Sequence, residues 1–66
     1  MDQPDELMTT AEVAALLRTP ENTVRYWRSV NVGPKSFRLP RRVVYWRRDV
    51  LAWLAQQEAT DQHRAS

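Results

Sequence analysis

Apolar residues recur at three- and four-residue spacing near the start of the chain, which is the pattern of an amphipathic helix. The stretch opens with Thr9 and Glu12, spaced as a capping box in which the hydroxyl and the carboxylate bind backbone N–H groups that the helix leaves free. Behind this cap, Val13, Leu16 and Leu17 fall on one face. We therefore expect a short helix from Thr9 that needs a partner to cover its apolar stripe.

Pro20 interrupts this pattern, because proline lacks an N–H and disfavours helical geometry at the residue before it. Since proline is well tolerated in the first turn of a helix, a second helix is expected to start there with Thr19 as its cap. Steps of 100° per residue place Val24 and Trp27 on its buried side. The other side carries polar groups, namely Asn22, Arg25, Tyr26 and Ser29, with Glu21 and Arg28 on the flanks. The pattern predicts a helix-turn-helix over residues 9–29.

Alternation of apolar and polar residues predicts a β-hairpin in the middle of the chain. Phe37 and Leu39 occupy every second position before Pro40, and Val43 and Tyr45 occupy every second position after it. Pro40 suits the second position of a type I turn. The hairpin then projects as a basic wing beside the second helix, with Arg41 and Arg42 at its tip and Lys35 and Arg38 behind them.

A third helix is expected to begin at Arg47, with Asp49 near the positive end of the helix dipole. Its apolar side consists of Val50, Leu51, Trp53 and Leu54, and Trp53 is expected in the core. The elements together predict a mainly α fold with a small β-hairpin. We expect a flexible tail over residues 1–7, one domain over residues 8–57 and a second flexible tail over residues 58–66.

Two apolar features lie outside this helical pattern. Val30 and Val32 precede a Gly-Pro turn signal and are expected to plug the edge of the core. If Tyr45 faces inward, alternation turns Trp46 outward together with Val44. An exposed tryptophan is a candidate contact for a protein partner or for a neighbouring copy of the chain.

Positive charge is concentrated in one part of the sequence. Between Arg18 and Arg48 there are nine basic residues and one acidic residue, a balance of +8, although the whole chain carries only +2. Such segregation indicates a polyanionic partner, and double-stranded DNA is the leading hypothesis. The alternative explanations involve no DNA: the arginines of the second helix are ordinary solvated charges, and those of the hairpin keep its edge soluble.

Several classes of function are disfavoured by composition. The chain has no cysteine, so a disulfide scaffold and a cysteine-based zinc site are excluded. His63 is expected in solvent, since no second ligand lies nearby in the sequence. Apolar runs are too short for a membrane span or a secretory signal, which favours a cytoplasmic chain without a membrane partner. No nucleophile and base set, carboxylate pair or phosphate-binding glycine loop is present, so we expect no enzyme, no cofactor and no small-molecule ligand.

The motifs occur in a recognisable order: Thr10-x-Glu12-Val13-Ala14, Asn22-Thr23-Val24-Arg25-Tyr26-Trp27-Arg28, Gly33-Pro34, Arg42-Val43-Val44-Tyr45 and Asp49-Val50-x-x-Trp53-Leu54. In this order the chain resembles the excisionase and AlpA-type winged helix-turn-helix proteins, which are related to the MerR DNA-binding domain. The resemblance covers about residues 8–57. It departs from that family at Arg18 and Pro40, where glycine is usual at the end of the first helix and in the wing turn.

The resemblance implies that the second helix enters the DNA major groove and that the wing reaches the minor groove. It assigns base and phosphate contacts on the helix to Asn22, Thr23, Arg25, Tyr26 and Arg28. On the wing it assigns them to Arg38, Arg41 and Arg42. We add Lys35 to the wing residues because it lies in the same basic segment. Arginine is suited to guanine O6 and N7, and asparagine to adenine N6 and N7.

Because the chain ends soon after the third helix, we expect no effector-sensing extension, which favours an architectural role. In a phage excisionase of this kind, copies bind side by side at an attachment region in the bacterial host cell, bend the DNA and direct an integrase toward excision. The sequence therefore predicts an excisionase with an integrase partner and cooperative self-association on DNA. A small AlpA-like transcriptional regulator is the first alternative, and a protein-interaction adaptor in phage assembly is the second.

Overall fold

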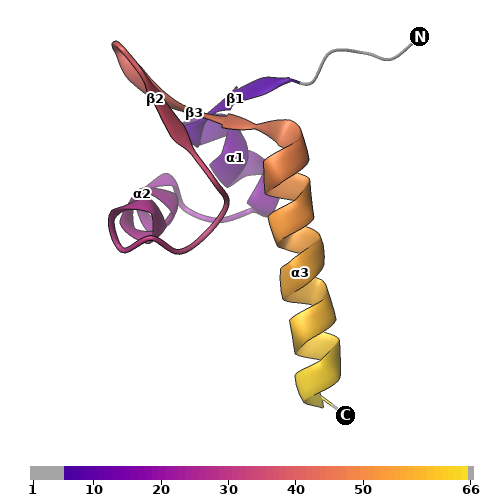
Figure 1. The fold of residues 1–66 in the computed structure, drawn as a ribbon. Helices are drawn as coiled ribbons and strands as arrows, with labels where there is room; N and C mark the ends of the chain where they lie inside the picture. The colour runs from indigo at the N-terminus through magenta and orange to yellow at the C-terminus, as the bar shows by residue number, and fades with distance from the viewer. Residues whose placement is uncertain (1–5, 66) are drawn as a thin grey trace, which may run out of the picture.

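The computed structural model describes residues 6–65 as three helices around a small antiparallel sheet (Figure 1). The strands are β1 (Leu7–Thr9), β2 (Phe37–Leu39) and β3 (Arg42–Trp46), and the helices are α1 (Thr10–Leu17), α2 (Glu21–Ser29) and α3 (Arg47–Ala65). The sheet order is β1-β3-β2. The helix-turn-helix, the hairpin wing and the third helix thus occur as expected, and the fold is a winged helix-turn-helix.

Helix α1 begins with the capping box that its sequence predicts. The Glu12 N–H donates to Thr9 Oγ1 at 3.1 Å, and the Thr9 N–H donates to Glu12 Oε1 at 2.8 Å. The helix ends at Arg18, whose φ of 53° and ψ of 45° are left-handed. This conformation turns the chain so that the Thr19 N–H can donate to the Ala14 carbonyl at 2.9 Å.

The prediction that Thr19 caps α2 is wrong. Its hydroxyl instead donates to the Leu17 carbonyl at 3.0 Å and so satisfies an acceptor at the end of α1. Pro20 is extended, with a φ of −58° and a ψ of 144°, and its carbonyl accepts from the N–H groups of Thr23 and Val24. Helix α2 therefore starts one residue later, at Glu21, without a side-chain cap.

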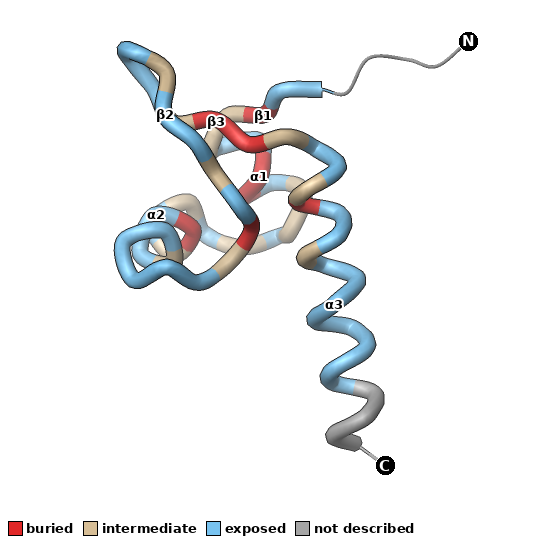
Figure 2. Tube along the Cα trace, viewed as in Figure 1, coloured by how far each residue is buried: buried red, intermediate tan, exposed pale blue. Residues whose placement is uncertain are grey.

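The core lies where α1, α2, the sheet and the first turn of α3 meet (Figure 2). At the edge of this core, Trp27 of α2 packs on Trp53 of α3, with ring centroids 5.3 Å apart. Gly33 makes room for this contact: its φ is 84°, and an added Cβ would lie 3.1 Å from Trp27 Cβ. The buried cluster consists of Met8, Val13, Ala14, Val24, Tyr45 and Val50.

The sheet has one strand more than predicted. Leu7, placed by the sequence in a flexible tail, pairs with Trp46 as the first residue of β1, and Met8 pairs with Tyr45. The Glu6 carbonyl extends this pairing by accepting from the Arg47 N–H at 2.8 Å. The remainder of the expected N-terminal tail, residues 1–5, lies outside the described residues.

Strand β3 is the central strand of the sheet, and its two adjacent residues Val44 and Tyr45 are buried on opposite faces. Tyr45 is 1% exposed in the main core, and Val44, expected to point outward, is 3% exposed on the other face. Trp46 shares that second face, but it is half-buried rather than free. Its ring packs on Phe37 at a centroid distance of 6.0 Å, and the Arg48 guanidinium lies 5.0 Å from the ring centroid.

Other apolar residues are more exposed than their pattern predicts. Val30 and Val32 do not plug the core and are 45% and 50% exposed, because the loop turns away at Asn31, whose φ is 61°. Leu51 and Leu54 are also exposed, and α3 leaves the rest of the fold after its first turns and projects from it (Figure 1). This helix continues to Ala65, through the segment expected as a tail. None of the helices in residues 6–65 has the length and apolar character that spanning a bilayer requires.

Candidate nucleic-acid interface

Helix α2 separates an apolar side from a polar side, as its sequence predicts. Val24 is 1% exposed and Trp27 is half-buried, so this side fixes the helix to the core. Tyr26, on the opposite side, is 62% exposed. Of the five residues that the resemblance assigns to this helix, Asn22, Arg25, Tyr26 and Arg28 are exposed, whereas Thr23 is half-buried.

An ion pair that the sequence interpretation overlooked lies on this exposed side. The Arg25 Nη2 donates to Glu21 Oε2 at 2.6 Å, one helical turn away. The pair remains accessible, since the two side chains are 62% and 41% exposed. Its signal was present in the sequence as an acid four residues before a base, the spacing at which side chains meet on a helix.

Arg28 lies at the junction between α2 and the core. Burial raises the pKa of the Tyr45 phenol, and the positive charge of Arg28 together with a hydrogen bond from Thr10 opposes that rise. Arg28 is therefore close enough to act on a core hydroxyl while its own side chain is exposed. It also shares the lining of a hollow of about 240 Å³ with Lys35, which places two cations at one concave site.

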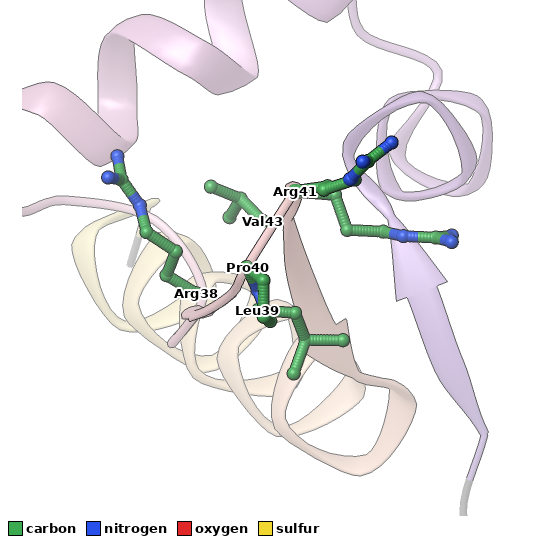
Figure 3. Close-up of a pocket in the computed structure, with 6 residues that line it drawn as sticks. Arg38, Leu39, Pro40, Arg41 and Val43 are labelled. Atoms are coloured by element: carbon green, nitrogen blue, oxygen red, sulfur yellow. The ribbon is translucent and has the colours of Figure 1, made fainter.

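The wing presents the second group of cations. Residue pairing between Leu39 and Arg42 leaves a two-residue turn, Pro40 and Arg41, at the tip of the β2–β3 hairpin. Arg38 points to one side of this hairpin and Arg41 to the other (Figure 3). Lys35, Arg38, Arg41 and Arg42 are all exposed. A hollow of about 250 Å³ at the tip is lined by Arg38, Leu39, Pro40, Arg41, Arg42 and Val43.

The interface offers hydrogen-bond donors on two separate projections, one helical and one a hairpin. Guanidinium and amide groups can bond to base edges and phosphates, and a helix of this width can enter a major groove. In the described part of the chain, no three acidic, histidine or cysteine side chains gather where a metal ion could be held.

A family model described as a helix-turn-helix domain matches residues 7–58, which include every element from β1 to β3 and α3 as far as Glu58. No curated protein and no solved structure matches the chain.

Proposed function

Because the chain belongs to the helix-turn-helix domain family, a family of DNA-binding domains, we propose that it recognises a specific sequence in double-stranded DNA. In this proposal α2 enters the major groove with Asn22, Thr23, Arg25, Tyr26 and Arg28, and the wing places Arg38, Arg41 and Arg42 at the neighbouring minor groove, with Lys35 on the phosphates between them. The observation that carries it is the exposure of an arginine-bearing helix face and a basic hairpin tip on one small domain.

The finer proposal is that the protein is a phage excisionase, active on the DNA of a bacterial host cell. A helix in one groove and a hairpin in the next can hold DNA in a bent shape, at a cost that depends on the sequence being bent. A single module of this kind buries only about 600–1,000 Å² on DNA, which is small for tight specific binding. Cooperative copies on neighbouring sites, and an integrase that uses the bent DNA, would supply the remaining affinity and the biological output.

The test is an excision assay with an integrase and its attachment-site DNA, comparing wild type with Arg25→Ala. We expect wild type to stimulate excision and Arg25→Ala to lose most of the effect through weaker DNA binding, by roughly 5- to 150-fold if Arg25 makes a bidentate base contact. Arg47→Ala is the matched control, because it removes the same positive charge outside α2 and the wing tip. Arg47 is the first residue of α3 and follows the end of β3 that lies away from the wing turn.

The outcomes separate the two levels of the proposal. If wild type binds a specific duplex but leaves recombination unchanged, the excisionase role is wrong and a transcriptional regulator of the AlpA type becomes the better explanation. If wild type binds no duplex at low salt, where phosphate contacts are strongest, the DNA-binding proposal itself fails.

A further inference from the structure

Glu21 is the one acidic residue in the basic segment between Arg18 and Arg48. It occupies the first position of α2, where a negative charge is favoured by the helix dipole. The dipole accounts for an acid in the first turn, but it does not require the carboxylate to bind Arg25. A carboxylate close to DNA phosphates also weakens binding to any sequence. Its position in the interface therefore calls for a compensating role.

We propose that Glu21 is a specificity-determining residue, which orients Arg25 toward a guanine and lowers the affinity for unrelated DNA. This inference rests on the proposed entry of α2 into the major groove. Glu21 would be a positioning residue that acts through Arg25.

The geometry of the pair supports this role. The carboxylate accepts from one terminal nitrogen of Arg25 at 2.6 Å, and a guanidinium has five N–H donors in a rigid plane. Donors therefore remain for the two acceptors of guanine, O6 and N7. A long side chain held in one rotamer loses less freedom on binding than one that samples many. Because the pair is exposed, Arg25 lies on the surface that would meet the DNA and stays accessible to a base edge.

The same carboxylate disfavours the competing mode of binding. On unrelated DNA an unrestrained Arg25 would turn to a phosphate, which any sequence offers. The ion pair with Glu21 keeps Arg25 from making part of that phosphate contact, and the Glu21 carboxylate also repels the phosphates. Specificity is the difference between the affinities for the right and the wrong DNA. A residue that weakens the wrong complex therefore raises specificity as effectively as one that strengthens the right complex.

The test uses the full chain and duplexes selected from a random pool by wild type. The base pair read by Arg25 is the position at which Arg25→Ala loses its preference. At that position, Glu21→Ala is expected to reduce the preference for guanine by roughly two- to fivefold, the range of an exposed ion pair and a part of the 5- to 150-fold that a bidentate contact supplies. Its affinity for a random duplex is expected to rise. Glu21→Gln retains an acceptor and should keep more of the preference while showing the same rise.

Two controls separate positioning from net charge. Glu58→Gln removes one negative charge from an exposed position on α3 and should leave the guanine preference intact. In the Arg25→Ala background, adding Glu21→Ala should produce no further loss of preference, because the residue through which it acts is gone. Circular dichroism of each variant shows whether α2 remains folded.

Each result is decisive for one of the two proposals. If wild type selects a sequence and Glu21→Ala keeps its full guanine preference, or if Arg25→Ala loses preference at no position, the role of Glu21 is overturned and DNA binding by the domain stands. If wild type binds no duplex, the proposed function fails and this inference fails with it.

Discussion

A left-handed backbone residue ends α1, and that residue is Arg18 rather than glycine. A Cβ in this conformation costs about 1–2 kcal/mol, which glycine avoids, although glycine also gains more entropy when the chain unfolds. Arg18→Gly is therefore expected to raise the free energy of unfolding by about 0.5–1 kcal/mol. For a domain of this size, a gain of 1 kcal/mol raises the Tm by about 4–8 °C.

Arg18→Ala is the matched control, since it removes the same charged side chain but keeps the Cβ. Urea unfolding should show stabilisation by glycine and not by alanine. An equal gain in both variants would assign the effect to the removal of the charge instead of the backbone.

At the scale of elements, what the sequence predicted well depends on neighbours along the chain. The capping box joins residues three apart, and the exposed face of α2 follows from its helical period. Strand β1 could not be recognised in this way, because three residues carry no pattern and their pairing with β3 joins distant parts of the chain. The outcomes at Val30 and Thr19 likewise depended on turns whose direction is set by backbone angles.

The candidate site follows the same division. The residues of α2 and the wing could be proposed from period and charge, and nearly all of them are exposed. The pairing of Glu21 with Arg25 was detectable from its spacing but was overlooked. The approach of Arg28 to Tyr45 was not detectable, since it depends on how α2 packs against the sheet.

The wing is the element whose contribution can be measured separately. If Arg41 and Arg42 meet phosphates or the minor groove, replacing both by alanine should lower the dependence of log K on log salt by about 1.8, or about 0.9 for each phosphate that is no longer neutralised. The fold should be unaffected because both side chains are exposed. Binding isotherms at several salt concentrations provide the measurement.

The control for the wing is a second pair of exposed arginines outside α2 and the hairpin, Arg18 and Arg47. Their double alanine variant removes the same charge and should change the slope much less. Equal slopes for the two double variants would mean that net charge, and not an interaction specific to the wing, governs the affinity.

At the scale of the whole molecule, the buried Tyr45 phenol of β3 is influenced by residues of both helices of the helix-turn-helix. Burial raises its pKa, while Arg28 and Thr10 oppose the rise. The folded state therefore holds this proton more tightly than the unfolded state, whose phenol titrates near pH 10. The resulting stability is complete below about pH 10 and is lost as the pH rises through the folded pKa.

We expect the urea midpoint of wild type to fall more steeply in this alkaline range than that of Tyr45→Phe, which cannot ionise. Tyr26→Phe, which removes an exposed phenol, should follow wild type. Parallel curves for wild type and Tyr45→Phe would contradict the prediction.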